Sequence, residues 1–247
     1  MPTMIFYNKI EPLSRQEHKD LRLKPQQDFA FARTAHMVPL AGAEFYSAAR
    51  YHPVVFSGEK ENLGPIAILG LKKDENDNID ADGRWRKGAY IPAFIRRYPF
   101  VLAETGKGPE ELTVCLDRDY AGWSTSEGVP LFNDDGSNSE LLDNALKFLQ
   151  EFGRQIERTK VFVAELDKRG LLIRRNADIT GSDGSKFHIQ DFLAVDEEKF
   201  GKLPAADLEF LHQQGFLGWI YAHLMSIANF TDLFELHRAR VGAPPKA

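Results

Sequence analysis

Residues 137–170 read SNSELLDNALKFLQEFGRQIERTKVFVAELDKRG and have the pattern of a long helix around which the rest of the chain is expected to pack. Ser137 and Glu140 stand three residues apart, as the two partners of a capping box do at the start of a helix. We expect a kink at Gly153 and the end of the helix at Gly170. The spacing of the apolar residues predicts one amphipathic helix of about 28 residues. These residues are Leu142, Ala145, Leu146, Leu149, Phe152, Ile156, Val163 and Leu166.

The sequence upstream of this helix contains many short apolar runs separated by proline and glycine. Runs rich in β-branched and aromatic residues, bounded by turn residues, are typical of strands. One helix is expected to interrupt them at 42–50, where Phe45, Ala48 and Ala49 repeat with helical spacing. The predicted strands cover residues 54–56, 66–71, 100–103 and 112–116.

The sequence downstream of the helix begins with two extended segments and continues with helical patterns. The extended segments, 171–174 and 187–195, flank a turn at 181–184. Beyond them, residues 204–240 predict two or three short helices. We expect these helices to be separated at Gly215, Gly218 and Asn229.

These patterns together predict the α+β fold class. A strand-rich part at 1–135 is packed by the long central helix, and a mainly helical part at 136–240 completes the fold. No stretch between the two parts has the composition of a linker. We therefore expect a single domain over residues 1–247.

The composition favours a soluble protein of the cytoplasm. Charged residues make up 27% of the chain and the net charge is −5, so the basic balance of a nucleic-acid binder is missing. The single cysteine, Cys115, allows no internal disulfide, which fits a reducing compartment. The first residues, MPTMIFYNKIEPL, do not form a signal-peptide pattern, and no apolar run is long enough to span a bilayer.

Local motifs for catalysis or metal binding are absent or incomplete. Residues 78–83, NIDADG, match the first half of a calcium loop, but Ala89 stands where the bidentate glutamate belongs. We therefore prefer an acidic hairpin turn over a cation site. Cys115 lies close to Asp117, which favours a buried thiol over a nucleophile. Phosphate-binding loops, nucleophile elbows and HExxH-type metal motifs do not occur, so we predict no catalytic residue, cofactor or metal ligand.

The most unusual segment is residues 85–104, WRKGAYIPAFIRRYPFVLAE. It combines aromatic side chains with arginines, a combination that is typical of surfaces that bind anions or protein partners. The alternative is a pair of core strands whose arginines pair with the acidic loop before them. Our candidate binding residues are Trp85, Tyr90, Arg96, Arg97 and Tyr98.

Within that segment, residues 90–100, YIPAFIRRYPF, resemble a block of the SapC family, which comprises bacterial proteins of about this length. Further blocks that are similar to the family lie at 51–56, 69–71, 131–136 and 220–224, in the family's order. The resemblance implies an association with the surface layer. Similar proteins are also encoded beside TonB-dependent receptors, flavin-dependent halogenase-like proteins and hydroxylases. The resemblance assigns no catalytic residues.

From these observations we expect a non-enzymatic accessory or binding protein that acts with a bacterial envelope or uptake system. Its partner would be a protein, a small peptide or an anionic ligand. One alternative is a small-molecule-modifying enzyme that uses His188, Asp191, Cys115 and the arginine pair. Another is a scaffold that forms oligomers, a homo-oligomer among the options, whose apolar face includes Trp219 of the C-terminal region.

Overall fold

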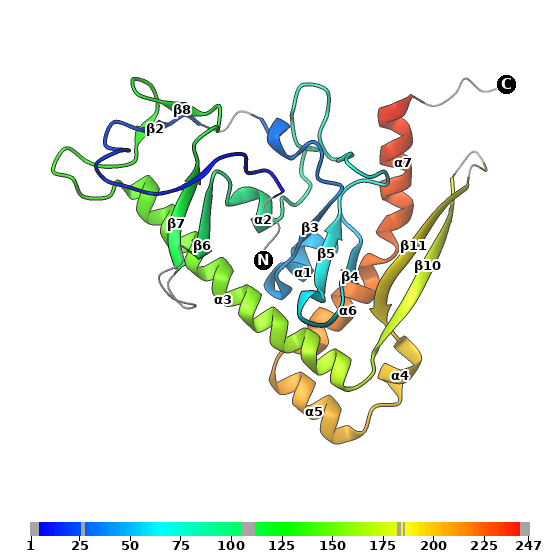
Figure 1. Cartoon of the computed structure of the whole chain (residues 1–247). Helices are drawn as coiled ribbons and strands as arrows, with labels where there is room; N and C mark the ends of the chain where they lie inside the picture. Colours follow the sequence, from blue (N-terminus) through cyan, green and yellow to red (C-terminus); the bar gives the residue numbers. More distant parts are fainter. Residues whose placement is uncertain (1–4, 26–27, 105–111, 182–183, 185, 243–247) are drawn as a thin grey trace.

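The structure, a computed structural model, describes residues 5–25, 28–104, 112–181, 184 and 186–242. Its longest element is helix α3 (Glu140–Lys168), which runs diagonally across the molecule (Figure 1). The predicted long helix is therefore confirmed. The chain stays helical through Gly153 and leaves the helix at Gly170, whose φ of +60° suits a glycine.

Helix α3 begins two residues later than the capping-box pattern predicted. Ser139 is the N-cap, and its Oγ accepts a hydrogen bond from the Leu142 N–H at 3.3 Å. Ser137 lies instead in the preceding turn, where its N–H and its hydroxyl donate to the Asp135 carboxylate at 2.8 and 2.6 Å. Because the turn engages Ser137, the second serine caps the helix.

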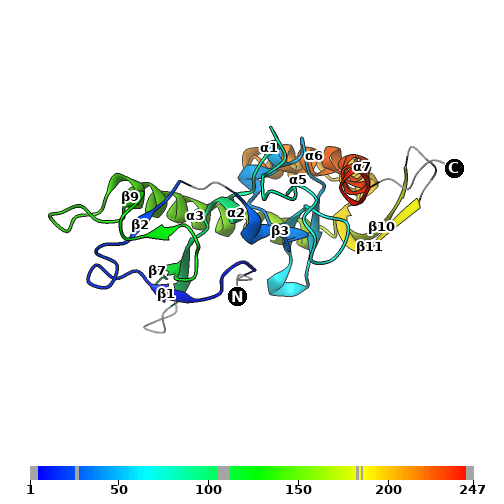
Figure 2. The ribbon, with the colours of Figure 1, turned by 90° about the horizontal axis from the view of Figure 1, so that it is seen from above.

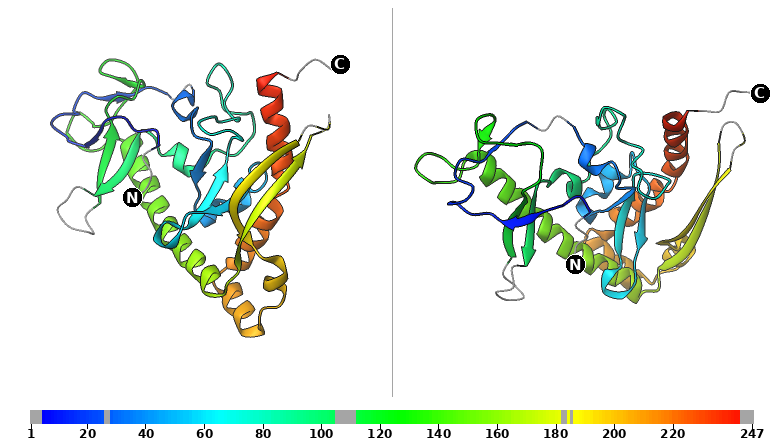
Figure 3. Two further views of the ribbon diagram at one scale, coloured as in Figure 1. Left: turned by 45° about the vertical axis from the view of Figure 1, so that its right-hand side comes forward. Right: turned by 45° about the horizontal axis from the view of Figure 1, so that its top comes forward.

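The largest sheet has five antiparallel strands in the order β10-β11-β4-β5-β3. Strands β10 and β11 form a long hairpin that lies beside the last helix, as two views show (Figure 3). The predicted strands at 54–56 and 66–71 and both extended segments after α3 belong to this sheet. Its strands are β3 (Met37–Pro39), β4 (Val54–Ser57), β5 (Gly64–Ile68), β10 (Leu172–Thr180) and β11 (Lys186–Val195).

Two three-stranded sheets lie at the other end of the molecule. In the first, of order β1-β7-β6, the N-terminal segment pairs with residues more than a hundred positions away, such as Ile10 with Asp117. The second has the order β8-β2-β9. The strands are β1 (Ile10–Pro12), β2 (Arg22–Leu23), β6 (Phe100–Glu104), β7 (Leu112–Asp117), β8 (Trp123–Ser124) and β9 (Val129–Pro130).

The remaining helices are short. Before α3 come the 3-10 turns η1 (Ala30–Ala32), η2 (Gly42–Glu44) and η3 (Lys60–Asn62) and the helices α1 (Phe45–Ala48) and α2 (Ala93–Arg96). After the hairpin come α4 (Glu197–Gly201), α5 (Ala205–Gln213), α6 (Phe216–Ser226) and α7 (Asn229–Val241). No helix in the described ranges is long and apolar enough to cross a bilayer.

Residues 204–240 form the three helices α5, α6 and α7, which confirms the two or three helices that the sequence predicted there, and α4 precedes this range. Gly218 does not separate two of them but lies inside α6. The hydroxyl of Tyr46 in α1 occupies the space of the missing side chain, only 1.8 Å from where a Cβ would stand. This glycine therefore serves the close packing of α1 on α6 and does not mark a turn.

Two apolar clusters meet on α3. Towards the C-terminal end of α3, Phe162 is fully buried among the rings of Phe45, Phe56, Phe216 and Trp219, with ring centres 5.1–6.2 Å away. Towards its N-terminal end, leucines of α3 pack under the β1-β7-β6 sheet. Helix α2 lies beside α3 between the two groups of strands (Figure 2). Among the C-terminal aromatics considered for a scaffold face, Phe216 and Trp219 are buried in the cluster around Phe162, whereas Phe230 and Phe234 are buried in a separate cluster against the β10–β11 hairpin.

A buried histidine joins β4 to β11, which share only the Leu193–Phe56 pair. The Nδ1–H of His223 in α6 donates to the Val54 carbonyl at 2.7 Å, and its Nε2 accepts from the Val195 N–H at 3.0 Å. Burial lowers the pKa of His223 to about 4, so the ring is neutral at pH 7. One uncharged imidazole thus hydrogen-bonds a backbone carbonyl of β4 and a backbone N–H of β11, beside the single residue pair that joins these strands.

Candidate functional site

Helix α2 is anchored by a buried carboxylate that the sequence analysis did not single out. Glu44 is 7% exposed, and its Oε1 accepts from the Ala93 N–H at 2.6 Å and from the Tyr90 hydroxyl at 2.9 Å. Its Oε2 accepts from the Ala41 N–H at 2.9 Å. Burial raises the pKa of Glu44, and these hydrogen bonds oppose that rise. Glu44 thereby fixes Tyr90 and the start of α2.

Arg96, at the end of α2, is exposed but held in place. Its Nε donates to the Ile91 carbonyl at 2.9 Å, and its Nη2 donates to the Tyr90 hydroxyl at 3.1 Å. The guanidinium carbon lies 5.6 Å from the centre of the Tyr90 ring and 5.1 Å from that of Phe148. No carboxylate of the described residues lies within ion-pair distance of this guanidinium. Arg96 is therefore a positioned cation without a direct ion pair, and the carboxylate of Glu44 reaches it only through the Tyr90 hydroxyl.

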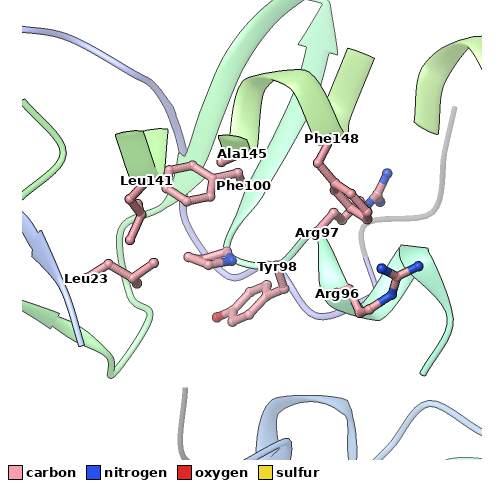
Figure 4. Close-up of a pocket in the computed structure, with 9 residues that line it drawn as sticks. Leu23, Arg96, Arg97, Tyr98, Phe100, Leu141, Ala145 and Phe148 are labelled. Carbon is pink, nitrogen blue, oxygen red and sulfur yellow. The ribbon is translucent and has the colours of Figure 1, made fainter. Parts of the chain in front are cut away.

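Beside Arg96 lies an open pocket of about 220 Å³, which we call the Arg96 pocket. Its walls come from β2, the end of α2 and the first half of α3. Figure 4 shows Leu23 and Leu141 on one side and Phe148 with the two arginines on the other. The lining residues are Leu23, Arg96, Arg97, Tyr98, Pro99, Phe100, Leu141, Ala145 and Phe148. The pocket is thus an apolar recess with two arginines and no acidic residue in its walls.

Arg97 lines the same pocket but is itself buried, with an exposed fraction of 7%. Its guanidinium carbon lies 4.0 Å above the centre of the Phe94 ring and 5.6 Å from that of Phe152. Its Nε and Nη2 have no hydrogen-bond partner among the described residues. Burial lowers the pKa of Arg97, and the adjoining Tyr7 opposes that shift. Arg97 therefore adds positive potential behind the pocket while it packs against aromatic rings.

Tyr98 is mainly a core residue. Its ring stacks on Phe31, with ring centres 4.2 Å apart, and its hydroxyl donates to the Asp117 Oδ2 at 3.1 Å. Burial, followed by the neighbouring Asp117, raises the pKa of Tyr98. Asp117 also accepts from the N–H groups of Asn8 and Lys9. Tyr98 thus ties the N-terminal segment to the wall of the pocket.

Trp85 lies apart from the other four candidates. Its ring packs edge-on against Phe29 and His52, with ring centres 5.7 and 6.2 Å away. The structure therefore brings Tyr90, Arg96, Arg97 and Tyr98 together around α2 and leaves Trp85 in a separate aromatic contact. The residues that complete the site come from other segments: Leu23 from β2, and Leu141, Ala145 and Phe148 from α3. The sequence analysis did not single them out as site residues.

The acidic loop at 78–83 forms a turn. Asp80 Oδ1 accepts from the N–H groups of Asp82 and Arg84 at 3.0 and 2.8 Å, and Gly83 has a φ of +83°. The backbone thus uses the carboxylate that a cation would need, as expected for an Asx turn.

The other residues considered for catalysis are dispersed. Cys115 is buried in β7, and burial raises the pKa of its thiol, which disfavours a thiolate. His188 hydrogen-bonds Asp178 on the β10–β11 hairpin, and Asp191 pairs with Arg174 on the same hairpin. None of them contacts the Arg96 pocket.

One further cluster was not foreseen from the sequence. Glu75, Asp77 and His237 each place a potential metal-ligand atom within 4.8 Å of the others. The buried Asp77 Oδ1, however, accepts from His237 Nδ1 at 2.9 Å and from Arg240 Nε at 2.8 Å, and Arg240 also pairs with Glu75. A guanidinium that already contacts both carboxylates opposes a cation there. The cluster fastens α7 to the loop after β5.

Comparison with known proteins gives one match. The family model SapC matches residues 13–233, which include the whole of α3 and every residue that lines the Arg96 pocket. Neither the curated proteins nor the solved structures give a match.

Proposed function

Since the chain belongs to the SapC family, we propose that it is a non-catalytic binding protein that recognises an anionic ligand or partner at the Arg96 pocket. The observation that carries the proposal is the setting of Arg96. Its guanidinium is exposed, oriented by Ile91 and Tyr90, and has no carboxylate partner among the described residues. Such a group can accept an anion without first breaking an ion pair.

The support around Arg96 is rigid. Buried Glu44 holds the Tyr90 hydroxyl, and that hydroxyl in turn accepts from Arg96. The Phe148 ring of α3, which also lines the pocket, has its centre 5.1 Å from the guanidinium carbon. A preorganised side chain loses less conformational entropy on binding, which favours a recognition role.

The setting that we propose for this role is the cytoplasm of a bacterium, beside an envelope or uptake system. It is supported by the surface-layer association that the resemblance to the SapC family implies, and by the single buried cysteine, which suits a reducing compartment. The partner would be a protein, a peptide or a small anion.

Native mass spectrometry tests the proposal. The wild type, Arg96→Ala and Lys147→Ala are purified gently from the same host and sprayed side by side. Lys147 is the matched control because it is an exposed cation on α3, next to Phe148, that does not line the pocket. We expect a retained molecule in the wild type and Lys147→Ala and its loss from Arg96→Ala.

Two results would contradict the proposal. One is a retained molecule that all three proteins hold equally. The other is a bare polypeptide in all three spectra, together with a pull-down from lysate in which the wild type and Arg96→Ala capture the same set of proteins. Thermal unfolding of each variant serves as the check that the fold is intact.

A further inference from the structure

The shape and charge of the Arg96 pocket restrict the chemistry of its ligand. We infer that the ligand is a monocarboxylate joined to a compact apolar group, with the carboxylate on Arg96 and the apolar group in the recess. The inference rests on the proposed binding function. It adds the ligand class, which that function leaves open.

The size of the recess sets the size of the apolar group. A cavity of about 150 Å³ lined by apolar side chains is known to hold a benzene ring. The Arg96 pocket, at about 220 Å³, therefore has room for one ring or a branched aliphatic group and a short linker. A larger ligand would have to extend out of the open recess into solvent.

The walls of the recess determine its polarity. The carbon surfaces come from Leu23, Pro99, Phe100, Leu141, Ala145 and Phe148. Burying apolar ligand surface against such walls is favourable, whereas a sugar would leave its hydroxyl groups without partners there. The deep part of the ligand is therefore apolar.

The charge at the mouth of the recess determines the anionic group. Arg96 uses Nε and one Nη2 hydrogen bond internally, and its Nη1 makes no hydrogen bond to the described residues. Arg97 adds positive potential but keeps its Nε and Nη2 buried. One accessible guanidinium matches one negative charge, since a phosphate dianion is usually held by several donors. A single carboxylate on the ligand therefore matches the charge at the mouth of the recess.

Two sources can supply this chemistry: a free small acid, or the C-terminal carboxylate of a polypeptide that ends in an apolar residue. Both would place a carboxylate on Arg96 and an apolar group against Phe148. The two sources differ only in what extends out of the pocket into solvent, so one titration series can separate them.

The test is a ¹H–¹⁵N NMR titration of the full chain with matched probes. The probes are 3-phenylpropionate, its amide 3-phenylpropanamide, and the tripeptide acetyl-Gly-Gly-Phe as the acid and as the C-terminal amide. We expect saturable shifts in the α2 region with at least one acid, and roughly tenfold weaker binding of the corresponding amide, since a charge-assisted hydrogen bond is lost. A tighter free acid identifies a small-molecule ligand, and a tighter tripeptide acid identifies a polypeptide C-terminus.

Two variants separate charge from shape. Arg96→Ala should weaken acid binding roughly tenfold and leave the amides unchanged. Ala145→Leu, which fills the recess without altering its charge, should weaken acids and amides alike. Lys147→Ala should change neither. Thermal unfolding confirms that each variant is folded.

The inference is overturned if neither acid gives a saturable shift up to about 10 mM, or if acids and amides bind equally. Either result leaves the proposed function standing if the wild type still retains an Arg96-dependent molecule in native mass spectra. If that retention is also independent of Arg96, the proposed function fails with it.

Discussion

Lowering the pH should weaken the fold through His223. Its pKa is held near 4 by burial, whereas an unfolded histidine titrates near 6.5, so between these values the unfolded state binds the extra proton. Stability that is fully present above pH 6.5 is therefore lost as the pH falls towards 4. Proton linkage gives a loss of about 2 kcal/mol in unfolding free energy between pH 7 and pH 5 from this residue alone.

Urea unfolding at pH 7 and pH 5, compared between wild type and His223→Gln, measures this contribution. Glutamine keeps one donor for the Val54 carbonyl and one acceptor for the Val195 N–H but cannot be protonated. The pH-dependent loss should be smaller in His223→Gln by about 2 kcal/mol. His212→Gln, at an exposed position, should follow the wild type. If His223→Gln loses as much stability as the wild type between these pH values, the buried neutral imidazole does not cause the pH dependence.

Two further predictions concern α3. Phe162→Ala should lower the unfolding free energy by about 3–5 kcal/mol, because the ring is fully buried among four others. The control Val161→Ala, at a side chain that is 53% exposed, should change it by less than about 0.5 kcal/mol. Equal effects of the two variants in urea unfolding would contradict this packing. Ser139→Ala should cost about 1 kcal/mol and Ser137→Ala distinctly less, because Ser139 is the N-cap. A larger loss of unfolding free energy for Ser137→Ala than for Ser139→Ala would contradict this assignment and support Ser137 as the N-cap.

Local patterns in the sequence predicted the α+β fold and its long helix. The helix could be predicted because its apolar face repeats over eight turns and Gly170 stops it. Four strands of the five-stranded sheet, β4, β5, β10 and β11, were likewise predicted from their apolar runs, whereas β3 was not. The pairing of Ile10 with Asp117 could not be predicted, because such long-range contacts leave no periodic signal in either segment.

The candidate site was predicted in part. The arginine and aromatic composition of residues 85–104 led to Arg96 and Tyr90, which the structure places in direct contact. The sequence could not show that α2 replaces a strand there, or that a buried Glu44 fixes it from a distant turn. Nor could it separate the exposed Arg96 from the buried Arg97, since adjacent arginines differ only in the direction that the helical turn gives them.

The proposed binding role of the Arg96 pocket depends on the charge of one side chain, and reversing that charge tests the role. Native mass spectra of the gently purified wild type and Arg96→Glu report the retained molecule in one comparison. We predict that the wild type retains a molecule and that Arg96→Glu, a folded protein with a carboxylate at the mouth of the pocket, retains none. Retention of the same molecule by Arg96→Glu, in the same amount, would contradict the claim.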